Sequence, residues 1–280
     1  MYTALVHGRP VSIPENMRDA AIELARLNKM DLEIYKLLNL RDEHERGLRI
    51  LRERLSILEI LHREADGQFV LFKFRRPVLY VPSDLDLLAP VDAVPLIVSI
   101  LREVGFRIVV QERYCVTLVK GDHIVDVYVH PCIGGSVVYL RGDVLLRHVD
   151  KVSILGVETL CLTPSAEALV AASHAVYKEG IVTLNDVVTI VKWINDDTLK
   201  LAHELHCLDA VKYVLDIARR VEHGLEELPH KIPTPTHARI IFRKVLRDPT
   251  FRETLLYFVE KLRDRRLGQS ILSHITRITY

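Results

Sequence analysis

Tyr80-Val81-Pro82-Ser83-Asp84-Leu85-Asp86-Leu87-Leu88 is the part of this sequence from which an expected fold and chemistry follow most directly. Two carboxylates stand one residue apart at the start of an apolar run, and alternation along a strand points both to one face. Like charges held this close repel unless a cation lies between them, as in a Mg²⁺ site for phosphate chemistry. Asp126 interrupts a second apolar run at residues 124–129. Three acids on two strands therefore predict one metal-binding site.

The segments around these acids show strand and helix patterns in turn. Residues 69–74 form an aromatic-rich run typical of a strand, and residues 91–104 fit a helix that Gly105 closes. Three more strands are expected at residues 107–111, 115–120 and 124–129. The Gly121-Asp122 pair between the last two predicts a hairpin turn.

Helical periodicity dominates both ends of the chain. Apolar residues recur every three or four positions across residues 12–65, and again after residue 160. The sequence thus predicts an α/β (α+β) protein with a small mixed sheet. We expect an N-terminal helical segment at residues 1–65, a core at 66–160 and a C-terminal helical region at 161–280.

Composition excludes several classes of protein. The 280 residues carry 38 basic and 37 acidic side chains, so net charge gives no argument for a nucleic-acid or membrane partner. No apolar run approaches the roughly 18 residues of a membrane span. The four cysteines form no CxxC pair, which favours a reducing, cytoplasmic location. Glutamine occurs only at Gln68, Gln111 and Gln269, a bias that favours a thermophilic source.

The order of the motifs resembles one known family. The motifs are Lys73, then Ser83-Asp84-Leu85-Asp86-Leu87-Leu88, Leu101-Arg102-Glu103-Val104-Gly105-Phe106 and Val125-Asp126-Val127-Tyr128-Val129-His130. Together they resemble the catalytic core of the DNA polymerase β-like nucleotidyltransferase superfamily, in particular its uncharacterised branch with helical flanks. The resemblance covers residues 66–130 and extends more faintly through residues 164–221, where the family often has an early histidine and this chain has His174.

The resemblance implies a two-metal site. Asp84 and Asp86 would ligate both Mg²⁺ ions, and Asp126 would complete the site nearest the attacking hydroxyl, as a ligand or as the group that accepts its proton. Two ions about 4 Å apart stabilise the entering and leaving oxygens of an in-line displacement. Many members carry a Gly-Ser or Gly-Gly turn before the acidic pair. Here the lysine matches the uncharacterised branch, but Phe74 stands where that branch often has glycine.

Five further residues are candidates to contact the substrate. Lys73, Arg75 and Arg76 could bind phosphate oxygens, since guanidinium groups clamp them in bidentate fashion. The alternative for the two arginines is a pair of surface charges beside a strand. Ser83 could touch a phosphate or a metal-bound water, although capping or turn formation suits it better. His130 shares the face of Asp126 if the strand stays regular.

The expected activity is metal-dependent transfer of a nucleoside monophosphate from a nucleoside triphosphate to a hydroxyl acceptor. The acceptor could be an RNA end such as that of a tRNA, a protein side chain or a small molecule. One alternative is a catalytically inactive module that senses nucleotides or binds proteins. Another is a structural protein whose acidic residues only cap helices and form turns. Basic residues on the C-terminal helices could meet RNA phosphates, but intervening acids favour a solvated face. The basic residues in question are Arg239, Arg243, Lys244, Arg247, Lys261, Arg263, Arg265 and Arg266.

Overall fold

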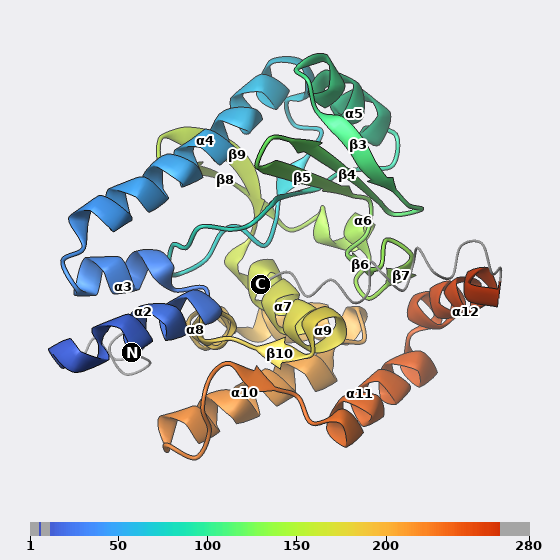
Figure 1. The fold of residues 1–280 in the computed structure, drawn as a ribbon. Coiled ribbons are helices and arrows are strands. Elements are labelled where there is room, and N and C mark those ends of the chain that lie inside the picture. Colours follow the sequence, from blue (N-terminus) through green and yellow to red (C-terminus); the bar gives the residue numbers. More distant parts are fainter. Residues whose placement is uncertain (1–5, 7–11, 264–280) are drawn as a thin grey trace.

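A mixed seven-stranded sheet forms the centre of the protein (Figure 1). The computed structural model describes residue 6 and residues 12–263. Helices α4 (Arg41–Ala65) and α5 (Val94–Glu103) pack on one face of the sheet, and the helices after residue 160 pack on the other. The predicted α/β class, with a mixed sheet flanked by helices, is confirmed.

The sheet combines parallel and antiparallel pairs, and its strand order is β3-β4-β5-β2-β1-β9-β8. β2 runs parallel to β5, and β1 runs parallel to β9, while the other neighbours are antiparallel. Two short ribbons, β6-β7 and β10-β11, stand apart from the sheet. The strands are β1 Val70–Leu71, β2 Leu85–Leu88, β3 Arg107–Gln111, β4 Cys115–Lys120, β5 His123–Tyr128, β6 Cys132–Ile133, β7 Val137–Val138, β8 Val149–Ile154, β9 Val157–Leu162, β10 Ile181–Val182 and β11 His230–Lys231.

Strict alternation on β2 and β5 sorts their side chains between two cores. Leu85, Leu87 and Val125 pack into the core beneath α4 and α5. Asp86 and Asp126 therefore point to the opposite face, because neighbouring residues on a strand face opposite ways. The C-terminal helices pack on that side of the sheet, where Asp86 is buried and Asp126 is half-buried.

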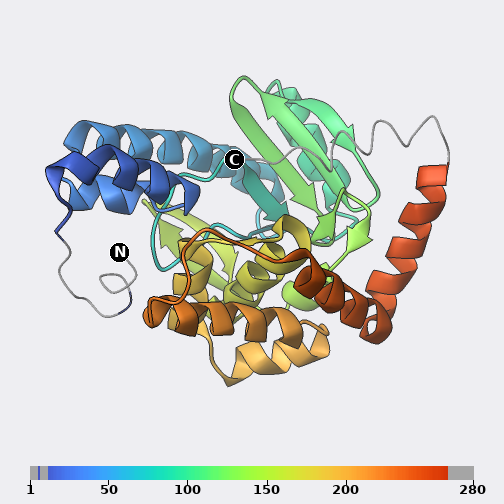
Figure 2. The same ribbon diagram turned by 60° about the horizontal axis from the view of Figure 1, so that its bottom comes forward.

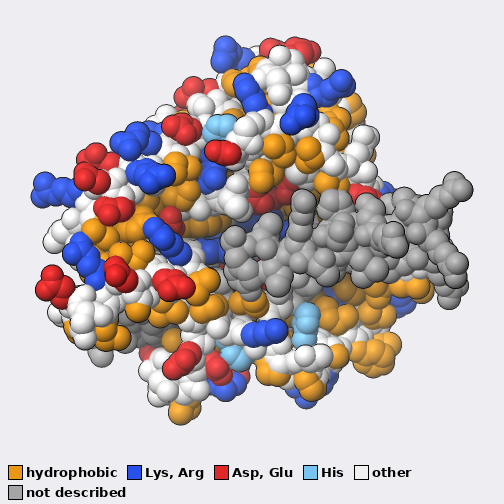
Figure 3. All heavy atoms as spheres, viewed as in Figure 1, with side chains coloured by type: hydrophobic (Ala, Val, Ile, Leu, Met, Phe, Trp, Pro, Cys, Tyr) orange, Lys and Arg blue, Asp and Glu red, His pale blue; other side chains and the backbone are white. Residues whose placement is uncertain are grey.

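The N-terminal segment is helical, as its periodicity predicts. From residue 12 onward it comprises a 3₁₀ turn and three α-helices, with the leucines of α4 facing the sheet. Acidic and basic side chains are interspersed over the outer surface of α4 (Figure 3), which is the pattern of a solvated helix face. The elements are η1 Glu15–Met17, α2 Arg18–Leu27, α3 Asp31–Leu37 and α4.

The helices after residue 160 gather into one layer, from which α12 extends toward β7 (Figure 2). Helix α7 is buried from Ala166 to its end and continues into a π-helical segment, η2. No helix in the described residues is long and apolar enough to cross a membrane. The short helix α6 Gly142–Leu145 precedes this layer, whose elements are α7 Pro164–Ser173, η2 His174–Glu179, α8 Leu184–Trp193, α9 Asp196–Glu204, α10 Leu208–Glu222, α11 Thr234–Arg247 and α12 Pro249–Arg263.

Candidate metal centre and cavity

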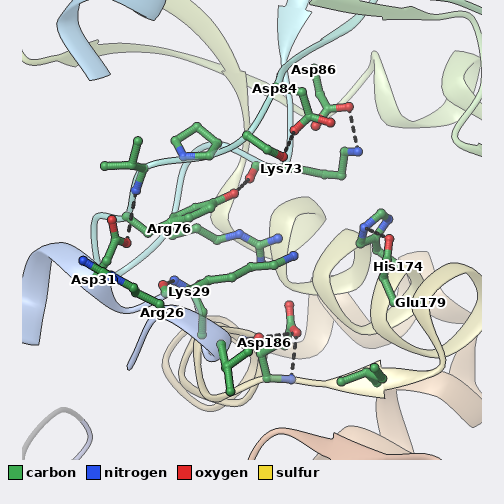
Figure 4. Close-up of a pocket in the computed structure, with 18 of the residues that line it drawn as sticks. Arg26, Lys29, Asp31, Lys73, Arg76, Asp84, Asp86, His174, Glu179 and Asp186 are labelled. Atoms are coloured by element: carbon green, nitrogen blue, oxygen red, sulfur yellow. Dashed lines mark hydrogen bonds and ion pairs between the residues drawn. The ribbon is translucent and has the colours of Figure 1, made fainter. Parts of the chain in front are cut away.

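The three acids singled out by the sequence come together on one face of the sheet. β2 and β5 are paired so that Asp86 lies directly opposite Asp126, and Asp84 precedes β2 by one residue. One oxygen from each carboxylate lies within 4.8 Å of the other two. Figure 4 shows Asp84 and Asp86 at one end of a cavity. The parallel pairing of two strands thus produces the juxtaposition.

The donor set fits a hard divalent cation. Oxygen ligands at about 2.1 Å from a Mg²⁺ ion lie at most about 4 Å apart, so small side-chain rotations would bring these oxygens to ligand distance. Carboxylate oxygens also suit Mg²⁺ and Mn²⁺ better than they suit softer metals. Asp84, Asp86 and Asp126 are the residues that could hold such an ion.

Burial and mutual repulsion raise the pKa values of Asp86 and Asp126. Asp86 is 6 % exposed, and burial, followed by the charge of Asp84, raises its pKa to about 7 against the opposing charge of Lys73. Burial and then Asp84 also raise the pKa of Asp126. The Thr117 hydroxyl donates to Asp126 Oδ1 at 2.5 Å, and the Tyr128 hydroxyl donates to Oδ2 at 3.2 Å. Three acids with one nearby ammonium leave the cluster short of positive charge.

Lys73 supplies that ammonium from the end of β1. Its Nζ lies 2.7 Å from Asp86 Oδ1, and the rings of Phe72 and Tyr128 are each centred 5.1 Å from it. Burial alone would lower the pKa of Lys73, but Asp86 and Asp84 raise it above its ordinary value, so the side chain stays charged. The strand expected at residues 69–74 ends at Leu71, because Lys73 has a left-handed backbone with φ of 59°.

A cavity of about 460 Å³ adjoins the acids and is lined by all three regions of the chain. The core contributes Lys73, Arg76, Tyr80 and the acidic pair, with Ser83 at the rim. The end of α2 contributes Arg26, the turn after it contributes Lys29, and η2 contributes His174 and Lys178. Such a volume is within the range of small-molecule sites.

The two candidate arginines lie in different surroundings. Arg75 Nη1 lies 2.8 Å from Asp150 Oδ2, with its guanidinium 5.9 Å from the Trp193 ring centre, and Arg75 does not line the cavity. Arg76 does line it, and its buried Nη1 atom makes no hydrogen bond within the described residues. Arg76 is therefore the arginine placed to meet a ligand.

Ser83 and His130 also differ in their position relative to the cavity. The Ser83 hydroxyl donates to Asp84 Oδ1 at 3.1 Å and lies at the cavity. His130 lies outside it, where its Nδ1 accepts the backbone N–H of Gly142 at 2.9 Å. Strand β5 ends at Tyr128, so the regular alternation on which the placement of His130 depended does not reach it. Burial lowers the pKa of this imidazole, consistent with a neutral acceptor.

Several cavity residues carry no signal in the sequence. Residues 12–65 show only an amphipathic pattern, which does not reveal that the turn holding Lys29 lies beside the acids. His174 is the exception, because the family resemblance marked it. Its Nδ1 lies 3.2 Å from the Tyr139 hydroxyl and its Nε2 lies 3.1 Å from Glu179 Oε1. Burial lowers the pKa of His174 well below its usual range, which favours a neutral ring that orients neighbouring groups.

Among the side chains that the structure describes, the basic residues of α11 do not form one free stripe. Lys244 is 2 % exposed and pairs with Asp248 at 2.7 Å. Arg243 and Arg247 both pair with Asp209, at 3.6 and 3.2 Å. Arg265 and Arg266 lie outside the described residues. Much of the positive charge on α11 is therefore already neutralised.

Glu167 on α7 predicts a pH dependence of stability. Its side chain is fully buried, with no well-formed hydrogen bond from a described residue, and burial raises its pKa to about 7 against the charge of Arg76. A carboxyl whose pKa is raised on folding stabilises the fold below its unfolded pKa, and this contribution is lost as pH rises to the folded pKa. The loss between pH 4.5 and 7 amounts to at most about 3 kcal/mol.

The test is urea unfolding of Glu167→Gln and wild type across pH 4.5 to 8. We expect the free energy of unfolding of the variant to fall less over this interval, because the glutamine does not titrate. Glu64→Gln on the exposed surface of α4 is the matched control and should follow wild type. Parallel curves for Glu167→Gln and wild type would contradict the prediction.

The site as a whole joins three convergent carboxylates to a cavity that carries several cations. Carboxylates that hold a divalent ion beside basic side chains can bind a phosphate ester and neutralise charge that develops on it. Chemically, the arrangement suits phosphoryl or nucleotidyl transfer better than acyl transfer, which would need an activated nucleophile. No family model, curated protein or solved structure matches this chain.

Proposed function

We propose that the protein is a metal-dependent nucleotidyltransferase that moves a nucleoside monophosphate from a nucleoside triphosphate to a hydroxyl acceptor. The observation that carries the proposal is the convergence of Asp84, Asp86 and Asp126, of which the first two line a cavity that Lys73 and Arg76 also line. The resemblance of the core to nucleotidyltransferases supports the same reaction.

The residues of the site would have distinct roles in this reaction. The three carboxylates would hold one or two Mg²⁺ ions, which supply charge neutralisation at the reacting phosphate when bound. Arg76, with a buried and unpaired Nη1, would contact phosphate oxygens. The acceptor oxygen forms a bond to the α-phosphorus as the bond to the bridging oxygen breaks, and pyrophosphate leaves. Asp126 is the candidate to accept the hydroxyl proton.

The direct test follows an α-phosphate label. Each of the four nucleoside triphosphates, labelled in this position, would be incubated with the full chain and Mg²⁺ or Mn²⁺, with and without total RNA. Transfer of label to protein or RNA, with release of pyrophosphate and complete inhibition by EDTA, is expected. A labelled protein band in the absence of RNA would identify a protein acceptor.

A second candidate, a nucleotide-sensing module without catalysis, is favoured by one contact. Lys73 Nζ already occupies one oxygen of Asp86 at 2.7 Å, and Phe74 replaces the small residue that many nucleotidyltransferases have nearby. Calorimetry with each nucleotide and Mg²⁺ separates the two functions. Metal-dependent binding without transfer to any acceptor supports the module, and absence of both binding and transfer refutes both functions.

A further inference from the structure

A second group of charged residues faces the cavity from the side away from the sheet. Arg26 comes from the last turn of α2 and Lys29 from the turn after it, while Arg76 comes from the loop after β1 and Lys178 from η2. Figure 4 shows Lys29 and Arg76 extending into the cavity, below Asp84 and Asp86. Cations from three separate parts of the chain thus converge on one space.

The backbone at Lys29 is held in an unfavourable conformation. Its φ of 55° lies in the left-handed region, where a residue with a side chain is strained unless its surroundings hold it. Asn28 Oδ1 accepts the backbone N–H of Leu184 at 2.8 Å, and the side-chain amide of Asn185 donates to the Lys29 carbonyl at 2.8 Å. Both asparagines are buried. The turn is therefore fastened to the start of α8, with a lysine at its most constrained position.

The cations of this group are short of partners. Neither the Lys29 nor the Lys178 ammonium makes an ion pair or hydrogen bond within the described residues, and Arg76 Nη1 is buried without one. Arg26 differs, because its guanidinium donates to the Tyr35 hydroxyl at 2.9 and 3.0 Å. Lys29 is exposed and Lys178 is half-buried, so water can hydrate both ammonium groups, and an anion between them would also supply the missing partner of the buried Arg76 Nη1.

The acids on the same side of the cavity are already engaged. Asp31 Oδ1 accepts the backbone N–H of Val81 at 3.3 Å, and Glu179 pairs with His174. Asp186 Oδ2 accepts from the backbone and hydroxyl of Thr183, at 3.0 and 2.6 Å, as the cap of α8. After the contact with His174, the charges of Lys178 and Lys29 also help to lower the pKa of Glu179, so Glu179 offsets part of their charge without pairing with either ammonium.

We propose that Lys29, Arg76 and Lys178 form a subsite for the phosphate groups of the substrate, so that the N-terminal helical segment contributes directly to ligand binding. This inference rests on the proposed function for the identity of the substrate. The ligand chemistry is that of a polyphosphate, either the part of the nucleotide that leaves as pyrophosphate or a phosphate of the acceptor. The segment lies outside the part of the chain that resembles nucleotidyltransferases.

The experiment measures pyrophosphate binding in EDTA by calorimetry at low salt, so that no metal contributes. We expect wild type to bind and Lys29→Met to bind at least 10-fold more weakly, since a hydrogen bond to a charged group contributes roughly 1.5 to 3 kcal/mol. Lys178→Met should weaken binding as well, and Lys29→Arg should retain it. Lys36→Met, on the exposed surface of α3, is the matched control and should bind like wild type. Circular dichroism confirms that each variant is folded.

Three outcomes decide the proposal. Absence of binding to wild type, or equal binding by wild type and Lys29→Met, would overturn it. If binding depends on Lys29 but no acceptor is ever labelled, the subsite stands and nucleotidyl transfer fails. Where transfer occurs, a raised KM for the nucleotide in Lys29→Met assigns the subsite to its phosphates, and a raised KM for the acceptor assigns it to the acceptor.

Discussion

Asp84→Asn is expected to reduce nucleotidyl transfer by roughly a thousandfold without lowering thermal stability. A bound metal ion contributes several kcal/mol to such a reaction, and about 4 kcal/mol corresponds to this factor in rate. Asp84 is half-buried, hydrogen-bonds to Ser83, and raises the pKa of Asp86 and Asp126 by repulsion. Loss of its charge relieves that repulsion, so the melting temperature should stay unchanged or rise.

The measurements are the transfer rate, the thermal melt and Mn²⁺ binding on the same protein. Asp92→Asn, at an exposed position before α5, is the control and should retain the rate and the Mn²⁺ affinity of wild type. Asp86→Asn is a poorer test, because it would leave the buried ammonium of Lys73 without its partner. Wild-type transfer by Asp84→Asn would remove the metal centre from the proposed mechanism.

Lys73→Met is expected to destabilise the metal-free protein by about 3 to 5 kcal/mol, the range for breaking one side of a buried ion pair. Lys73 and Asp86 are 7 % and 6 % exposed, and the cluster would keep three carboxylates with no ammonium beside them. A divalent cation would then replace the missing positive charge. We therefore expect Mn²⁺ to stabilise Lys73→Met more than it stabilises wild type, in which the lysine competes for Asp86.

Urea unfolding in EDTA and in excess Mn²⁺ measures both effects. Lys151→Met is the matched control, because Lys151 and Glu158 form an exposed pair at 3.8 Å that contributes at most about 1 kcal/mol. The control should show a small loss of stability that Mn²⁺ does not restore. A Lys73→Met protein as stable as wild type in EDTA, or with the same response to Mn²⁺, would contradict this account of the ion pair.

The sheet around the metal centre was largely predictable, because alternation has a local cause. The strands expected at residues 107–111 and 115–120 have the observed bounds of β3 and β4, and β5 differs from its expected range by one residue at each end. The acids belong to two such strands, so their spacing in the sequence was enough to predict that their side chains share one face of the sheet. The hairpin of β8 and β9 was not predicted, although Gly156 turns it with φ of 91°.

The rest of the cavity depends on contacts that no local pattern encodes. Lys29 is brought to the cavity by hydrogen bonds to residues 156 positions away. The strand expected at residues 69–74 ends before Lys73, because the backbone of Lys73 is left-handed. Lys244 belonged to a helical set of basic residues, yet it is buried and paired, and helical spacing alone does not distinguish it from its exposed neighbours. Periodicity thus predicted the elements, and tertiary contacts determined which charges meet.

The amide of Asn28 has a consequence for the order of folding. It bridges the N-terminal turn to Leu184 and to the carbonyl of Leu228, closing loops of 156 and 200 residues, whereas β3, β4 and β5 pair through short hairpins and neighbouring segments. Contacts between distant parts of a chain form slowly because loop closure must be completed first. We therefore expect the strand pairs to form early, and the cavity to be completed only when the segments that hold Leu184 and Leu228 dock against Asn28.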